Sequence, residues 1–141
     1  MIQYDYNNEL FENPIPSIEI ELRTPLQDDA SARRVLMVLD SGADMTCLPK
    51  RALSAIGKLS TGTRTVIDYE GLSHEAITRF VDLVFDGVRM KNLEVVEIPQ
   101  DFGFIGRDVL NRHKIVMDGP SCVWYREEDP PKTCGKKSRA K

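Results

Sequence analysis

The sequence predicts a mostly β domain with one short helix near its C-terminal end. Apolar and polar residues alternate over 18–23, which is typical of a strand with one buried face. The unbroken apolar run Val35–Leu39 indicates a strand that is buried on both faces. Asp86-Gly87 lies between two apolar runs and is a strong hairpin signal. Residues 107–113 are expected to form the short helix, so strands make up most of the predicted fold.

The remaining segments are predicted from their apolar residues, prolines and glycines. In chain order, we expect an extended N-terminal segment (1–16), a polar loop (24–33), a short strand at 46–49, a helical turn at 50–56 that stops at Gly57, three strands (63–69, 76–85 and 93–98) and two late strands (114–117 and 122–126).

The length and charge of the chain indicate one folded domain with a basic tail. A chain of 141 residues is the size of one ordinary domain. The net charge is −3, yet residues 130–141 contain five basic side chains and no acidic one. We therefore expect an extended segment at 1–16, the folded domain at 17–128 and a disordered tail at 129–141. The acidic body argues against nucleic-acid binding by the whole protein, and a weak nucleic-acid or partner contact is an alternative for the tail alone.

The composition is that of a globular protein without a membrane-spanning stretch. The hydrophobic fraction is 41%, and no apolar run is long enough to cross a bilayer. The N-terminus lacks the basic start and apolar stretch of a secretory signal. Cys47, Cys122 and Cys134 form neither a paired framework nor a tight metal spacing. We therefore expect reduced thiols in a cytoplasmic protein.

The most informative segment is Asp40-Ser41-Gly42-Ala43-Asp44, which follows the predicted buried strand directly. It places a carboxylate at the end of a strand, with a glycine turn behind it. Gly42 has no side chain, so the backbone can turn sharply and its N–H can approach the carboxylate. Taken alone, the segment could also be ordinary turn chemistry in which Asp40 accepts a local backbone N–H. A calcium loop that uses Asp40 and Asp44 is excluded by the number and spacing of its ligands.

A second motif, Phe104-Ile105-Gly106-Arg107-Asp108-Val109-Leu110, places two apolar residues and a glycine ahead of the short helix. Together the two motifs resemble those of the retropepsin-like (retroviral-type) aspartic proteases. The resemblance covers roughly residues 17–120, and Val116–Pro120 looks more like the bacterial and other cellular relatives than the viral enzymes. It implies a mostly β, closed barrel-like acid protease lobe with one short C-terminal helix.

The resemblance implies that one chain supplies half of an active site. Pepsin-type enzymes carry two Asp-Thr/Ser-Gly triplets in one polypeptide, whereas this chain contains one. Two carboxylates held close together share a proton, because their repulsion raises the pKa of one of them. The ionised carboxylate can then take a proton from water while the protonated one donates to the substrate carbonyl. We therefore expect a homodimeric aspartic endopeptidase with catalytic Asp40 from each chain at the twofold axis, a peptide or protein substrate, and no metal or organic cofactor.

The resemblance also implies roles for the neighbours of the catalytic acid. The Ser41 hydroxyl would bond to the matching loop of the partner chain, and Ala43 would pack beneath the turn. Asp44 would face the substrate backbone or pair with Arg107, whose planar fork suits a carboxylate. A plain surface salt bridge is the alternative for that pair. Taken alone, Phe104-Ile105-Gly106 is more typical of a core strand than of a catalytic segment.

One hairpin, over 65–80, lies where the family has its flap, the lid that closes over substrate and excludes water. The candidate flap residues are Tyr69, Glu70, Gly71 and Leu72, with Gly71 at the tip. Viral flaps are rich in glycine, whereas this turn contains one. An ordinary surface hairpin without a lid role is the alternative.

The sequence offers two locations for the dimer interface. Viral enzymes build theirs from terminal strands, but this chain continues past the helix through Val123–Tyr125. Those residues could form the interface with Trp124 as its anchor, since aromatic side chains are enriched in interface hot spots. A core tryptophan packed against the helix is the alternative for Trp124.

Two other functions are compatible with parts of the sequence. The domain could be a non-catalytic dimerisation or peptide-binding module that kept the fold. An intact Asp40-Ser41-Gly42 argues against this, because a binding module has no need of two juxtaposed acids. A Cys-His nucleophile that uses His74 or His113 has no supporting motif.

Overall fold

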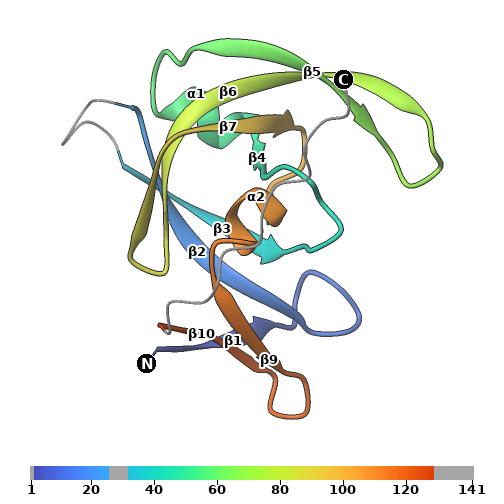
Figure 1. Ribbon diagram of the computed structural model, residues 1–141, viewed down its shortest axis with the longest axis vertical. Helices are drawn as coiled ribbons and strands as arrows, with labels where there is room; N and C mark the ends of the chain where they lie inside the picture. The colour runs from blue at the N-terminus through green and yellow to red at the C-terminus, as the bar shows by residue number, and fades with distance from the viewer. Residues whose placement is uncertain (1, 26–31, 129–141) are drawn as a thin grey trace, which may run out of the picture.

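The computed structural model describes residues 2–25 and 32–128 (Figure 1). The predicted tail at 129–141 and most of the predicted polar loop at 24–33 lie outside the described residues. The described elements, in chain order, are β1 (Gln3–Asn7), β2 (Ile15–Arg23), β3 (Arg33–Leu39), β4 (Cys47–Pro49), α1 (Lys50–Ala55), β5 (Thr61–Ile67), β6 (Ser73–Phe85), β7 (Val88–Ile98), β8 (Gly103–Ile105), α2 (Arg107–Leu110), β9 (Lys114–Asp118) and β10 (Val123–Glu127).

Six of these strands close into a mixed barrel. β2 pairs antiparallel with β3, β3 pairs parallel with β8, and β8 pairs antiparallel with β4. β4 pairs parallel with β7, β7 pairs antiparallel with β6, and β6 returns to β2. The long strand β6 permits this closure because it reaches three neighbours, β5, β7 and β2. The mostly β, closed barrel expected from the sequence is confirmed.

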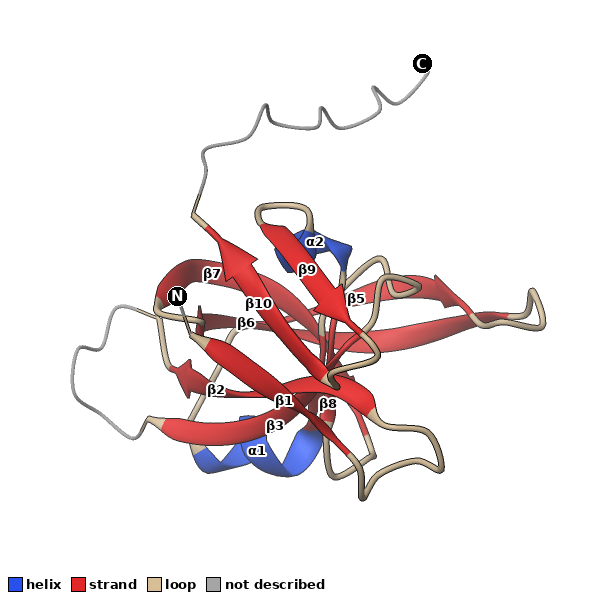
Figure 2. Cartoon of the chain, turned by 90° about the horizontal axis from the view of Figure 1, so that it is seen from below, coloured by secondary structure: helices blue, strands red, loops and turns tan. Residues whose placement is uncertain are grey.

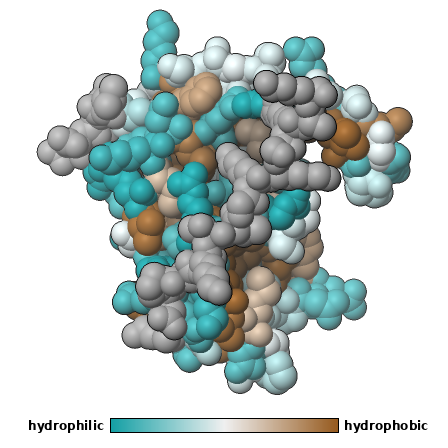
Figure 3. Space-filling model, viewed as in Figure 1, coloured by the Kyte–Doolittle hydropathy of each residue, from teal (hydrophilic) through white to brown (hydrophobic). Residues whose placement is uncertain are grey.

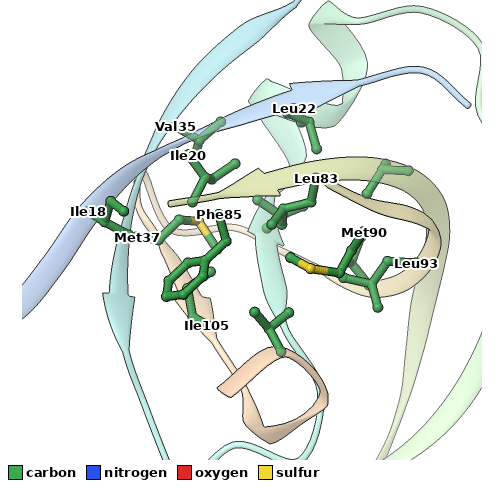
Figure 4. Close-up of a cluster of buried hydrophobic side chains, with 14 of the residues drawn as sticks. Ile18, Ile20, Leu22, Val35, Met37, Leu83, Phe85, Met90, Leu93 and Ile105 are labelled. Atoms are coloured by element: carbon green, nitrogen blue, oxygen red, sulfur yellow. The ribbon is translucent and has the colours of Figure 1, made fainter. Parts of the chain in front are cut away.

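The barrel interior is filled by side chains from facing walls (Figure 4). The alternation predicted over 18–23 buries Ile18, Ile20 and Leu22, each at most 6% exposed. The side chains that meet them come from β3, β6, β7 and β8 and include Val35, Met37, Leu83, Phe85, Met90, Leu93 and Ile105. Removal of this apolar surface from water is the main force that holds the barrel closed.

The structure contains two short helices where the sequence predicted one helix and one helical turn. The turn predicted at 50–56 is the helix α1, and Gly57 follows it with φ of +111°, the left-handed conformation that ends many helices. α2 is shorter than the predicted 107–113. After Leu110 the backbone forms tighter turns, because the N–H groups of Arg112 and His113 donate to the carbonyls three residues back, those of Val109 and Leu110. Within the described ranges, no helix is long and apolar enough to span a membrane.

A second, smaller sheet contains β1, β10 and β9, with β10 in the middle (Figure 2). β1 places Gln3 opposite Tyr125, and its last two residues, Tyr6 and Asn7, pair with β2. The N-terminal segment predicted as extended therefore contains a strand that joins β10 to the barrel strand β2.

Trp124 lies in β10, the middle strand of this sheet, and its side chain is fully buried. Its ring stacks between two others, with centroids 4.7 Å from Tyr4 and 5.7 Å from Phe85. Its indole N–H donates to the backbone carbonyl of Ser17 at 2.8 Å. Trp124 is thus a core residue, and its ring neighbours come from β1 and β6 where the alternative expected the helix. Its side chain is not a surface anchor for a partner.

Replacing Trp124 by alanine should destabilise the chain strongly. Burial of the ring and its hydrogen bond are both lost, so the free energy of unfolding should fall by about 3–5 kcal/mol. Urea denaturation followed by circular dichroism measures the change. Tyr69→Ala is the matched control because that ring is 97% exposed, and it should leave the midpoint unchanged. An unchanged midpoint for Trp124→Ala would contradict the core role.

Candidate active site

Asp40 is the first residue after β3, and its position is fixed by β8. Leu39 lies opposite Ile105 in the parallel pairing of the two strands. The Asp40 N–H donates to the Ile105 carbonyl at 2.9 Å, which extends that pairing by one residue. The two sequence motifs, distant in the chain, are therefore adjacent in space.

The Asp40 carboxylate is oriented by its own turn. Asp40 Oδ1 accepts the Gly42 N–H at 2.9 Å, and the Asp40 carbonyl accepts the Ala43 N–H at 3.1 Å. A Cβ on Gly42 would lie 3.1 Å from Asp40 Oδ1, so a side chain there would crowd the acid. Asp40 is half-buried and the Ser41 side chain is exposed. Within residues 2–25 and 32–128, neither Asp40 Oδ2 nor the Ser41 hydroxyl has a hydrogen-bond partner.

Arg107 holds the backbone of this loop more closely than it holds Asp44. Its Nη1 donates to the Ser41 carbonyl at 2.7 Å, and its backbone N–H donates to the Ala43 carbonyl at 2.8 Å. The ion pair between Arg107 Nη2 and Asp44 Oδ1 is 3.6 Å long, and the Asp44 side chain is 89% exposed. Exposed pairs of this length contribute little to stability. Asp44 and Arg107 thus form an ion pair, but the main contact of the Arg107 guanidinium is its hydrogen bond to the Ser41 carbonyl.

Two residues with no role in the sequence analysis complete the loop. Asp108 Oδ2 accepts the Thr46 N–H at 3.0 Å, and Asp108 Oδ1 accepts the Thr46 hydroxyl at 2.7 Å. The Thr46 hydroxyl oxygen in turn accepts the Gly106 N–H at 3.1 Å. Asp108 directly follows Arg107 in the second motif, but its partner Thr46 could be found only once the two segments were known to touch.

The second motif packs through its glycine and its aliphatic residue. A Cβ on Gly106 would lie 2.6 Å from the Met45 carbonyl carbon, so any side chain there would push the loop away. Ile105 is fully buried in the barrel. Phe104 points to the other side of β8, since side chains alternate along a strand. There its ring is 5.4 Å from that of Phe102, which also contacts Phe11.

Cys47 lies beside the acids and is not an activated thiol. Burial raises its pKa to about 11, and the negative charges of Asp108 and Asp40 add to the rise. The two histidines have other neighbours, because His74 bonds to Asp68 and His113 packs against Phe85. The geometry therefore gives no support to a Cys-His nucleophile. Among the described residues, no group of acids, histidines and cysteines is arranged to hold a metal.

The candidate flap is the hairpin of β5 and β6, whose free end projects from the barrel (Figure 1). Asp68 organises its turn: Asp68 Oδ1 accepts the N–H groups of Glu70 and Leu72, both at 2.9 Å, and Oδ2 lies 2.7 Å from His74 Nε2. Gly71 has φ of +82°, which a glycine adopts without strain. Tyr69 and Leu72 are 97% and 56% exposed, and hydrophobic side chains show at this end of the hairpin in Figure 3.

A closed mixed barrel with an Asp-Ser-Gly loop at the end of β3 is the arrangement of one aspartic protease lobe. The family profile described as aspartyl protease matches residues 28–109. That match covers more than half of the chain, so the protein belongs to the aspartyl protease family. No curated protein matches the sequence.

The solved structures similar to this chain include two proteases. A retropepsin-like aspartic protease from Rickettsia conorii has a TM-score of 0.54 and 19% identity, over 88% of this chain and 97% of that one. The EIAV protease in complex with the inhibitor HBY-793 has a TM-score of 0.53 and 19% identity, over 76% of this chain and 91% of that one. These likenesses confirm the retropepsin-like fold.

Replacing Asp68 by asparagine should loosen the flap turn. The hydrogen bond to His74, followed by those from the backbone, holds the pKa of Asp68 below its ordinary value of 3.8. A lowered folded pKa means that this support is complete above the unfolded pKa and is lost as the pH falls through the lowered one. At neutral pH, Asp68→Asn should therefore speed limited proteolysis within 68–72 several-fold. Glu70→Gln removes a charge from the same turn and should leave the cleavage rate unchanged. Equal rates for Asp68→Asn and the wild type would refute this role.

Proposed function

We propose that the protein is a homodimeric aspartic endopeptidase in which Asp40 of each chain is the catalytic acid. The observation that carries the proposal is the Asp40 loop, in which Gly42 orients one carboxylate oxygen while Oδ2 and the Ser41 hydroxyl have no partner in the described part of the chain. Membership of the aspartyl protease family supports the assignment.

The chemistry requires a second copy of the loop. One Asp40 can act as a base or as an acid, but the reaction needs both at once. Two Asp40 carboxylates at a twofold axis share one proton, because repulsion prevents both from ionising. The ionised member removes a proton from water, the water oxygen attacks the peptide carbonyl, and the protonated member donates to the carbonyl oxygen. The same pair then protonates the leaving amine. The Ser41 hydroxyl is available to bond to the partner's loop and hold the two acids in register.

The flap supplies the means of excluding water from this chemistry. Its free end exposes Tyr69 and Leu72, and exposed apolar groups of this kind mark interaction surfaces. A peptide bound in extended form would lie between the two Asp40 loops and the flaps, with backbone hydrogen bonds of the β type. In this proposal Asp44 faces the peptide backbone, since its carboxylate is exposed and its ion pair with Arg107 is long.

The interface between the chains is constrained by the smaller sheet. β10 has β1 on one side and β9 on the other, so Val123–Tyr125 cannot add a partner's strand by backbone pairing. Among residues 2–25 and 32–128, β9 is the last strand in the sheet order. We place the partner at this strand rather than at Trp124.

Replacing Asp40 by asparagine should remove peptidase activity. The amide cannot act as the base, so kcat/KM on a peptide library should fall by at least about 100-fold. Asp5→Asn, an exposed change in β1, is the matched charge control and should keep full activity. A fully active Asp40→Asn protein would refute the proposal. A dimer that binds peptides but does not cleave them at acidic or neutral pH would favour the peptide-binding module.

Mixing wild-type chains with Asp40→Asn chains tests the shared site. If each active site needs one Asp40 from each chain, an equimolar exchanged mixture should retain about a quarter of the activity of the same total amount of wild type. Two independent monomeric sites would retain half instead. Sedimentation on the same samples shows whether both proteins dimerise, and a mixture with Asp5→Asn should lose no activity.

A further inference from the structure

Arg107 and Asp108, at the start of α2, bond to four residues of the Asp40 loop (40–46). Arg107 bonds to the carbonyls of Ser41 and Ala43, as described above. The backbone N–H of Asp108 donates to the Asp44 carbonyl at 3.3 Å. The Asp108 carboxylate uses both of its oxygens on a single residue of the loop, Thr46.

Thr46 is the point where the loop becomes strand β4, and it is completely buried. Its carbonyl accepts the Val96 N–H at 2.9 Å, which ties it to β7. Its hydroxyl accepts the Gly106 N–H and donates to Asp108, so that every polar group of Thr46 is paired. The loop is therefore fastened at its start by the Asp40 N–H and at its end by Thr46.

We propose that Asp108 is a positioning residue which, through its two hydrogen bonds to Thr46, holds the Asp40 loop in the geometry that the paired acids require. The inference rests on the proposed peptidase function and adds a residue to its machinery. In this role Asp108 acts through Thr46 and does not take part in the chemical step itself.

A carboxylate suits this task for two reasons. An ionised acceptor makes shorter and stronger hydrogen bonds than a neutral one, and two oxygens fix both the distance and the angle of Thr46. Precise placement matters because a displacement of about 1 Å in a catalytic group can cost about 100-fold in rate. Two loops must meet at the twofold axis, so a displacement of each loop changes the distance between the two carboxylates twice over.

A simpler role for Asp108 is electrostatic. Its charge and that of Asp40 both contribute to the raised pKa of the nearby Cys47 thiol. Removal of the Asp108 charge would thus change the electrostatic field near Asp40 without moving the loop. Thr46→Val separates the two roles, because it removes the hydroxyl contact and leaves both carboxylates in place.

The test compares Asp108→Asn, Thr46→Val and Thr46→Ser in the full chain, with Asp5→Asn as the charge control. Asp108→Asn and Thr46→Val should each lower kcat by about 10- to 100-fold while KM changes by less than about 3-fold. Thr46→Ser keeps the hydroxyl and should stay within about 3-fold of the wild type. The double variant should be no worse than the poorer single variant, since both substitutions disrupt the same contact between Asp108 and Thr46.

The pH profile of kcat/KM supplies a second readout. Displaced loops should bring the two apparent pKa values of the acid pair closer together, and this should happen in both Asp108→Asn and Thr46→Val. A change in Asp108→Asn alone, additive losses in the double variant, or a higher KM at unchanged kcat would each overturn the positioning role.

Amide hydrogen exchange keeps the inference testable if the wild type cleaves no peptide, in which case the proposed function itself fails. Exchange at Gly42 and Ala43 should be faster in Asp108→Asn and Thr46→Val than in the wild type, and close to wild type in Thr46→Ser. Unchanged exchange at these amides in both variants would overturn the inference, whatever the activity.

Discussion

The parallel pairing of β3 with β8 is the constraint on which the site depends. It sets Leu39 opposite Ile105 and lets Asp40 continue the ladder by one hydrogen bond. Parallel neighbours cannot be joined by a tight turn, so the chain between them must travel around the barrel before β8 can form. The acid is therefore placed by the closed barrel as a whole and by neither motif alone.

The two motifs fit together mainly through backbone atoms. The carbonyls of Ser41, Ala43 and Asp44 all face the start of α2, and Gly106 leaves room for the Met45 backbone. Backbone contacts restrict side-chain identity little. This is a physical reason why the same fold occurs in a Rickettsia conorii protein that is 19% identical to this chain. The side chains that do matter for the fit are few, namely Arg107 and Asp108 in one motif and Thr46 just after the other.

The features that could be predicted from the sequence are those that depend only on residues close together in the chain. The alternation at 18–23 and the apolar run Val35–Leu39 identify β2 and β3, because each pattern reports burial directly. The environment of Trp124 could not be decided, since its burial depends on Tyr4 from the other end of the chain. The link between Asp108 and Thr46 was missed for the same reason: one residue begins a helix, the other ends a loop, and only the tertiary fold brings them together.

The position of β10 between β1 and β9 has a consequence for how the molecule is made. Gln3 lies opposite Tyr125 in the pairing of β1 with β10. β1 therefore cannot pair with β10 until nearly all of the described chain has been synthesised. Contacts of such long range slow folding, because a large loop must close before any stabilising contact is gained. Until β10 emerges from the ribosome, Tyr4 lacks the Trp124 ring on which it stacks, so this part of the core is among the last to form.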